Sequence, residues 1–379
     1  MGRKEGNMMA DGALPELGFY ALAGGPLTPR DVIAEVALAE ELGLGSAFLS
    51  ERYNVKEAAT ITGAIGAVST QLGIATAVTN INTRHPLVTA GHATTMQALT
   101  GGRYTLGLGR GIDMVFGAMG LKASTTAELE DFAGLIRRLA AGEVITGHDG
   151  PAGRWPRLAI SPPPAYPVPL LITAFGPQTL RLAARAYDAV VLHTFFTDDT
   201  TRRCVEIVRD ECRRIGRDPR AVRIWSCYAT VREDLPEEVV LKKTVGRLSG
   251  YLQGYGDLLV ATNGWSPEPL ARFRSDPVVQ SIRGAIDTLA STAELEHIKT
   301  LLPADWLASA ALGSAAECAA AVCKQFELGV DGVIMHGASP PELAPVIAAY
   351  RGIRSGAMHA GLSRNPGAPR SGLPGAAEQ

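Results

Sequence analysis

Short apolar segments alternate with amphipathic helical segments along almost the whole chain. Helix starts are readable between them, for example in the capping box from Thr125 to Glu128 and at Ser339, which precedes Pro340. This alternation is typical of repeated β–α units that form a parallel sheet. Eight segments have the composition of buried strands: LGFYAL from Leu17, SAFLS from Ser46, LGIATAV from Leu72, RYTLGLG from Arg103, PLLIT from Pro169, DAVVLH from Asp188, VRIWSCYA from Val222 and DGVIMH from Asp331. Eight such units predict an α/β fold, a closed (β/α)8 TIM barrel, rather than an open doubly wound sheet.

Two insertions and two tails interrupt or flank the predicted barrel, which spans residues 17–352. Residues 144–168 are too rich in glycine and proline for a helix and are expected to form a loop or a short hairpin. Residues 236–312 contain several helical segments where one would suffice. We expect both insertions at the C-terminal face of the barrel, where active sites and lids are built. Residues 1–16 are predicted to be a tail, and the polar, Pro/Gly-rich residues 353–379 a disordered tail.

Composition and charge argue against nucleic acid, membranes and metals as partners. The 379 residues include 36 basic and 38 acidic ones, without a basic block that would follow a phosphate backbone. Neither a signal peptide nor a segment apolar enough to span a bilayer is apparent, so we expect a cytoplasmic protein. The five cysteines form no C-x-x-C pair, and no spacing predicts a metal site or a nucleophile elbow.

The segment ATAVTNINTRHPLVTA, residues 75–90, starts as a strand and ends as a helix, with a polar stretch between the two. On composition alone this stretch is an ordinary polar loop. Arg84 and His85 then simply satisfy the helix entrance beside Pro86.

A longer block, AVTNINTRHPLVTAGHATTMQALTGGRYTLGLGRG at residues 77–111, resembles the bacterial luciferase-like superfamily of flavin-dependent oxidoreductases, most closely its coenzyme F420 (5-deazaflavin) branch. DVIAEVALAEELGLGSAFLSER, PLLITAFGPQTLRLAARAYDAVVLH and ELGVDGVIMHGASPPELAPVIAAY share the resemblance. It implies a barrel with inserted segments that transfers a hydride between F420 and a small organic substrate. Two alternatives stay open: an FMN-dependent monooxygenase that uses reduced flavin and oxygen, and a non-catalytic cofactor-binding barrel. Dimerisation is common in the family, so we expect a homodimer.

The resemblance also assigns a role to the polar stretch. In deazaflavin members of the family, a non-prolyl cis peptide at the end of the third strand backs the cofactor ring. The matching bond joins Ala77 and Val78. The resemblance further implies that backbone and side-chain groups of Thr79 and Asn80 meet the polar edge of the deazaflavin.

Several candidate catalytic residues follow predicted strands, where catalytic groups of barrels normally lie. Arg52 ends the second strand at a position that is histidine in several relatives; because arginine stays protonated, it suits an anionic substrate or cofactor oxygen better than proton transfer. Its neighbour Glu51 is expected to bind the cofactor ring or to pair with Arg52 at the surface. Asp113, after the fourth strand, is the carboxylate nearest to a position that is acidic in some relatives. His193 and His336, after the sixth and eighth strands, are expected to donate to substrate or phosphate, or to be structural.

Glycine-containing turns follow the fourth and fifth strands. Gly109 and Gly111 in GLGRGID would let the backbone approach a flat ring, but Ile112 stands where a dinucleotide fingerprint requires glycine. The segment AFGPQTL starts a helix, whose free N–H groups favour an anion. Such a helix start needs no ligand, yet the resemblance implies that this region holds the cofactor phosphate. The expected cofactor contacts are Gly176, Pro177, Gln178 and Thr179.

Overall fold

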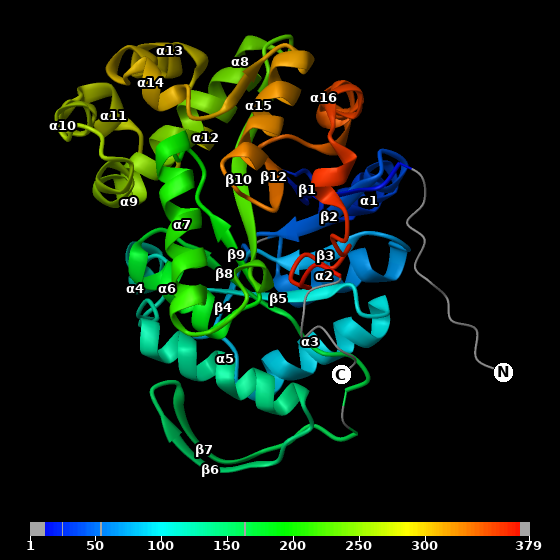
Figure 1. The fold of residues 1–379 in the computed structure, drawn as a ribbon. Helices are drawn as coiled ribbons and strands as arrows, with labels where there is room; N and C mark the ends of the chain where they lie inside the picture. Colours follow the sequence, from blue (N-terminus) through cyan, green and yellow to red (C-terminus); the bar gives the residue numbers. More distant parts are fainter. Residues whose placement is uncertain (1–11, 25, 54, 163, 372–379) are drawn as a thin grey trace.

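The computed structural model describes residues 12–24, 26–53, 55–162 and 164–371. Eight parallel strands form a closed barrel (Figure 1), because each strand pairs with the next around the ring and the last pairs back with the first. In ring order the strands are β1 (Leu14–Tyr20), β2 (Leu44–Leu49), β3 (Gly73–Thr76), β5 (Tyr104–Gly109), β8 (Leu170–Ala174), β9 (Ala189–Leu192), β10 (Arg223–Arg232) and β12 (Gly332–His336). A two-residue strand, β4 (Thr79–Asn80), follows β3 and pairs with β5. The predicted TIM barrel is confirmed.

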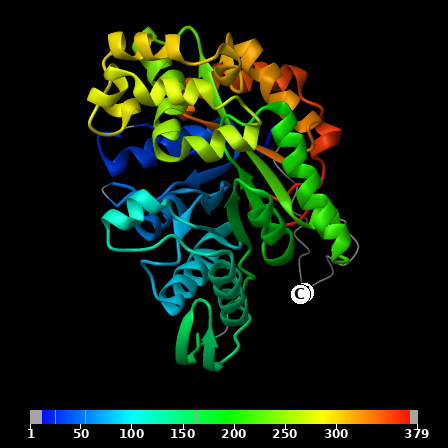
Figure 2. The same cartoon turned by 90° about the vertical axis from the view of Figure 1, so that its left-hand side faces the viewer.

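Helices cover the outside of the barrel between successive strands (Figures 1 and 2). The main outer helices are α1 (Val32–Glu41), α2 (Ala58–Val68), α3 (Pro86–Thr100), α5 (Thr126–Ala140), α6 (Pro177–Ala186), α7 (Asp198–Arg214), α15 (Ala315–Glu327) and α16 (Pro340–Ile353). A short helix, α4 (Asp113–Ala118), lies between β5 and α5. The predicted capping box is present at Thr125, whose side chain accepts from the N–H of Glu128 while the Glu128 side chain accepts from the N–H of Thr125.

The inside of the barrel is filled by an apolar cluster. Its buried members are Phe48, Ala75, Ala77, Leu171, Ala189, Val191, Trp225, Cys227 and Ile334. Tyr20, the last residue of β1, and Val78, which follows β3, are partly buried and pack against this cluster at the carboxyl-terminal end of the strands. Polar groups that follow the strands therefore lie next to a packed apolar interior. Each fully buried large apolar side chain of this interior contributes about 1.5–3 kcal/mol to the stability of the fold.

The first insertion is an antiparallel hairpin of β6 (Ile145–Gly150) and β7 (Gly153–Leu158). A short hairpin was one of the two predicted forms, but the insertion point differs from the expected one. The hairpin follows α5 and leads into β8, so it leaves the barrel at the amino-terminal ends of the strands. Its Trp155 ring lies 4.4 Å from the ring of His85, at the start of α3.

The second insertion follows β10 and therefore lies at the C-terminal face, as expected. Figures 1 and 2 show its helices grouped at one end of the molecule. It contains α8 (Glu237–Leu241), a π-helical turn η3 (Lys242–Gly246), α9 (Arg247–Asn263), α10 (Glu268–Ser275), α11 (Pro277–Ser281), α12 (Ile286–Leu289), α13 (Thr292–Leu301) and α14 (Ala304–Leu307). A final strand, β11 (Ala311–Gly313), pairs with the end of β10.

The chain after α16 closes the amino-terminal end of the barrel. The Asn365 side chain is buried and donates to the carbonyl oxygens of Gly102 and Tyr104 at 2.8 and 2.9 Å. The indole N–H of Trp225, from the barrel interior, donates to the carbonyl oxygen of Pro366 at 2.9 Å. The expectation of a disordered tail is therefore wrong for residues 354–371, because polar groups of this segment satisfy buried donors and acceptors of the barrel.

The remaining residues of the two predicted tails, 1–11 and 372–379, lie outside the described residues. β1 begins at Leu14, so the barrel starts three residues earlier than predicted. None of the helices in the described part of the chain is long and apolar enough to cross a bilayer.

Candidate active site

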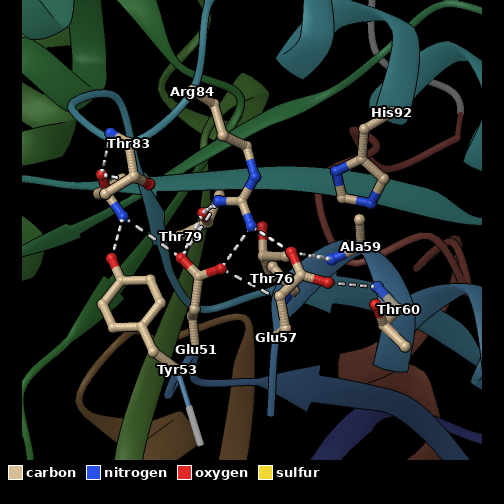
Figure 3. Close-up of polar contacts among 12 residues, drawn as sticks. Glu51, Tyr53, Glu57, Ala59, Thr60, Thr76, Thr79, Thr83, Arg84 and His92 are labelled. Atoms are coloured by element: carbon tan, nitrogen blue, oxygen red, sulfur yellow. Dashed lines mark hydrogen bonds and ion pairs between the residues drawn. The ribbon is translucent and has the colours of Figure 1, made fainter.

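A network of charged side chains, of which Glu51 is buried, lies where β2 and β3 end (Figure 3). Glu51, two residues after β2, is buried, and Arg84 Nη2 donates to its Oε1 at 2.5 Å. Arg84 Nη1 donates to the Thr79 hydroxyl at 2.6 Å, and the same guanidinium contacts the carboxylate of Glu57. Glu57 in turn caps α2 by accepting from two backbone N–H groups. Arg84 thus links the residues that follow β2, the polar stretch that follows β3, and the start of α2.

The network shifts the pKa values of Arg84 and Glu57. Burial opposes the charge of Arg84, but Glu51 and Glu57 outweigh burial and raise the pKa of Arg84 above its usual range. Burial also acts to raise the pKa of Glu57, yet hydrogen bonds from Thr60, Ala59 and Arg84 lower it to about 2. Arg84 and Glu57 are therefore both charged at pH 7. The surface pair of Glu51 with Arg52, one of the two expectations for Glu51, is absent from the described ion pairs, and Glu51 pairs with Arg84 instead.

The peptide bond between Ala77 and Val78 is cis, at the position that the resemblance implied. The following residues turn their side chains inward: the Thr79 hydroxyl donates to Glu51 at 2.7 Å, and Asn80 Nδ2 donates to the Tyr53 hydroxyl at 2.7 Å. Because these side chains are buried and already bonded, the structure does not support their predicted contact with a cofactor edge. Contact through the backbone of Thr79 and Asn80 stays a prediction. Val78 is partly exposed above the barrel interior.

Arg52 is an exposed cation beside this network. Its Nη1 donates to the hydroxyl of Ser50 at 3.0 Å and to the carbonyl oxygen of Glu51 at 2.7 Å. Within the described part of the chain Arg52 forms no ion pair. Burial, followed by the cations Arg52 and Arg247, lowers the pKa of the neighbouring Lys56 to about 8. The cations that lie near Arg52 are consistent with the predicted affinity of this residue for an anionic group.

His193 follows β9 and lies in an aromatic cluster of Phe175, Phe196, Tyr251 and Tyr255. Its ring lies 4.1 Å from Phe175 and 4.7 Å from Tyr251, measured between ring centroids. Nδ1 is 2.8 Å from the carbonyl oxygen of the next residue, and Nε2 is 2.9 Å from the Tyr255 hydroxyl. Burial lowers the pKa of His193 to about 4, so the ring is neutral at pH 7.

The second insertion supplies three side chains that the sequence analysis did not identify. Arg247, Tyr251 and Tyr255 follow one another at intervals of four residues along α9, which places them on one face of the helix. The Tyr251 and Tyr255 rings stack with centroids 5.6 Å apart. The π-helical turn η3 precedes this face, and Tyr255 itself departs from helical geometry; both features are frequent at functional sites. The four-residue spacing is the signal that could have found these residues.

Two further groups, His336 on β12 and Cys227 on β10, lie near the aromatic cluster. The His336 ring lies 5.3 Å from the Tyr20 ring, and its Nδ1 is buried without a hydrogen-bond partner in the described structure. Burial, with smaller contributions from Arg247 and other cations, lowers the pKa of His336 well below its usual value. Burial raises the pKa of Cys227 to about 11, so this residue is a thiol and not a reactive thiolate.

The glycines at the end of β5 and just after it make room for protein side chains. A Cβ atom on Gly109 would lie 2.3 Å from Val78 Cγ2, and one on Gly111, whose φ is +83°, would lie 2.5 Å from the Phe116 ring. These neighbours account for both glycines without a ligand, so their predicted contact with a cofactor ring stays a prediction. Asp113 is exposed at the start of α4, and its side chain has no hydrogen bond or ion pair among the described residues, so the structure does not join it to the charged network.

The amino-terminal end of α6 is open. Gly176 is the N-cap residue, no side chain caps the helix, and a Cβ atom on Gly176 would have no neighbour within 4 Å. Pro177 and Gln178 are exposed and Thr179 is partly buried. Because Phe175 precedes this helix and contacts His193, the uncapped N–H groups lie next to the aromatic cluster.

Known proteins resemble this chain over about half to two thirds of its length. A 5,10-methylenetetrahydromethanopterin reductase from Methanolobus tindarius is 26% identical over 249 residues, which cover 63% of this chain and 74% of that protein. An F420-dependent glucose-6-phosphate dehydrogenase from Beutenbergia cavernae is 33% identical over 188 residues, 46% of this chain and 55% of that protein.

The fold also matches solved structures. The coenzyme F420 dependent tetrahydromethanopterin reductase from Methanopyrus kandleri has a TM-score of 0.73 at 15% identity, covering 90% of this chain and 99% of that chain. The family model described as luciferase-like monooxygenase matches residues 14–332. Since this match runs from β1 to the first residue of β12, the chain belongs to the luciferase-like monooxygenase family.

Proposed function

We propose that this protein is an oxidoreductase that transfers a hydride between coenzyme F420 and a small organic substrate. Relatives named for F420 support the choice of cofactor. The observation that carries the proposal is the open amino-terminal end of α6 beside the aromatic cluster. It combines an anion-binding helix end with a partly exposed apolar surface, as a phosphorylated flat cofactor requires.

The residues of the site fit this cofactor. The N–H groups of Gln178 and Thr179 would hold its phosphate, and the absence of neighbours around the Gly176 Cβ position leaves space for it. Val78, which packs against the barrel interior, would contact the ring. The next residue, Thr79, is held in place by its hydrogen bond to Glu51. When bound, the deazaflavin accepts or supplies a hydride at C5. The protein positions the substrate and excludes water with the aromatic cluster.

The cation Arg52 would bind an anionic oxygen of the substrate or the cofactor, because it has no carboxylate partner in the described structure. It takes no part in proton transfer. The homodimer and the cytoplasmic location remain predictions.

Equilibrium binding of purified protein to F420 and, separately, to FMN tests the proposal. We expect F420 to bind and FMN to bind far more weakly. Gly176→Val should weaken F420 binding at least about tenfold, or about 1.4 kcal/mol, since the new side chain obstructs the helix end without meeting protein atoms. Gly134→Val in α5 is the matched control, because its Cβ position is equally free, and it should bind F420 normally.

The outcomes separate the alternatives. Tight binding of FMN without F420 would favour the monooxygenase. Binding of F420 without turnover of any hydride donor or acceptor would favour the non-catalytic barrel. Equal F420 affinity of the Gly176 and Gly134 variants would place the phosphate away from α6.

A further inference from the structure

The hydrogen bonds of His193 fix the positions of its ring protons. A carbonyl oxygen only accepts, so the contact of 2.8 Å between Nδ1 and the Thr194 oxygen requires a proton on Nδ1. In the neutral ring Nε2 is then an acceptor, and the Tyr255 hydroxyl, 2.9 Å away, donates to it. The Tyr255 oxygen keeps lone pairs with which it can accept a proton from a third group.

Burial keeps the His193 ring neutral at pH 7, so that its Nε2 can take up a proton. With a pKa of about 4, roughly one His193 ring in a thousand is protonated at pH 7. Burial, Tyr251 and Cys227 raise the pKa of Tyr255 well above its usual value, against the cations Arg52 and Arg247. The titratable or charged groups around the pair are Arg52 after β2, Cys227 on β10, Arg247 and Tyr251 on α9, and His336 on β12.

We infer that Tyr255 and His193 form a proton relay that takes up the hydroxyl proton of an alcohol substrate, so that the enzyme works in the direction of alcohol oxidation. This inference rests on the proposed function, which supplies the oxidised deazaflavin as hydride acceptor. The carbinol C–H bond breaks and its hydrogen leaves with both electrons as a hydride to C5 of that acceptor. The O–H proton moves to the Tyr255 oxygen, the Tyr255 proton moves to His193 Nε2, and the alcohol carbon becomes a carbonyl carbon.

The relay explains how a tyrosine with a raised pKa can serve as a proton acceptor. Because the hydroxyl gains one proton as it loses another, no buried phenolate forms. His193 then carries the charge, and its low pKa makes it release the proton to solvent before the next turnover. Two other groups at the barrel mouth do not replace the pair: an arginine such as Arg52 is no proton acceptor, and Cys227 is a buried thiol hydrogen-bonded to Thr194 Oγ1.

Nitrogen NMR of protein labelled at its histidine rings tests the relay without cofactor. At pH 7 we expect the His193 signals of a neutral ring with the proton on Nδ1, assigned with the His193→Asn variant. Tyr255→Phe should move the Nε2 resonance, because it removes the donated hydrogen bond. Tyr251→Phe removes a hydroxyl from the same helix face and should leave that resonance in place. A proton on Nε2 at pH 7, or the same spectrum for Tyr255→Phe and wild type, would overturn the relay.

Kinetics test the direction of the reaction. A panel of secondary alcohols and glucose 6-phosphate is offered with oxidised F420, and a panel of ketones and enones with reduced F420. We expect turnover of a hydroxylated compound, with kcat independent of pH between about 6 and 8 and falling only below about 5, since the relay base has a pKa near 4. Tyr255→Phe should lower kcat roughly a hundredfold to ten-thousandfold with a smaller change in KM.

Turnover confined to the reductive panel would overturn the inference, as would an inflection of kcat near pH 6.5 or a Tyr255→Phe change confined to KM. Failure of the proposed function is separately visible as loss of F420 binding in the wild-type protein. In that case the NMR measurement still decides whether the hydrogen-bonded pair exists.

Discussion

Replacing Arg84 by methionine should destabilise the protein, because it removes the cation from a buried network and retains the length of the side chain. The side chains of Arg84 and Glu51 are 13% and 4% exposed. Breaking a buried pair from one side leaves an uncompensated charge and costs about 3–5 kcal/mol. Glu57 is 41% exposed, so its share is screened by water. Thr79 and the N–H of Ala58 still donate to Glu51, so we expect the lower end, about 3 kcal/mol.

Thermal unfolding measures this cost. At about 2.1 cal/mol/K per residue, a chain of 379 residues has an unfolding entropy of about 0.8 kcal/mol/K, so a loss of about 3 kcal/mol lowers Tm by roughly 4 °C. Arg138→Met is the control, because Arg138 pairs with Glu143 in an exposed ion pair. Its Tm should match that of the wild type.

A Tm of Arg84→Met within about 1 °C of the control would refute the reasoning, since Glu51 would then tolerate the loss of its cation. Arg84→Lys distinguishes charge from geometry. Lysine restores the charge but not the several donors that reach Glu51, Glu57 and Thr79, so partial recovery of Tm is expected.

Three further changes test other parts of the structure. Asn365→Ala should cost about 1–3 kcal/mol in urea unfolding, because it removes the buried side chain that bonds to Thr105 and to the carbonyl oxygens of Gly102 and Tyr104; an unchanged midpoint would contradict the role of the tail. Lowering the pH from about 6.5 towards 4 should lower Tm, because burial lowers the pKa of His92 to about 4 and the unfolded chain binds the proton first. His92→Gln should make this decline shallower, and an identical decline would refute the assignment. Gly109→Ala should cost about 1–3 kcal/mol by differential scanning calorimetry, because its Cβ would meet Val78; a wild-type Tm would show that Val78 moves freely.

The sequence was sufficient to place residues that directly follow barrel strands. A parallel barrel brings all carboxyl-terminal strand ends to one face, so a correct strand count locates Glu51, Arg52 and His193 without any knowledge of distances. Their partners were harder to predict. Arg84 lies 33 residues from Glu51, and composition alone assigned it to the helix entrance. The pairing depends on how the chain turns after β3, which local pattern does not specify.

Residues on the second insertion were missed for a related reason. The spacing of Arg247, Tyr251 and Tyr255 defines a helix face, but periodicity does not say which surface that face covers. The tail was mispredicted because composition measures apolar content, whereas the contacts of Asn365 and Pro366 are hydrogen bonds to specific buried groups.

The positions of Arg52 and the Tyr255–His193 pair suggest why the position after β2 can do without a histidine. β2 and β9 are four strands apart in a ring of eight, so Arg52 and His193 follow strands on opposite sides of the barrel. A substrate between them would meet a fixed cation on one side and a proton acceptor on the other. Because Tyr255 belongs to the second insertion, that insertion would supply part of the chemistry as well as the substrate contacts. Changes in α9 should therefore alter the pH dependence of turnover, whereas changes at Arg52 should alter the affinity for anionic groups.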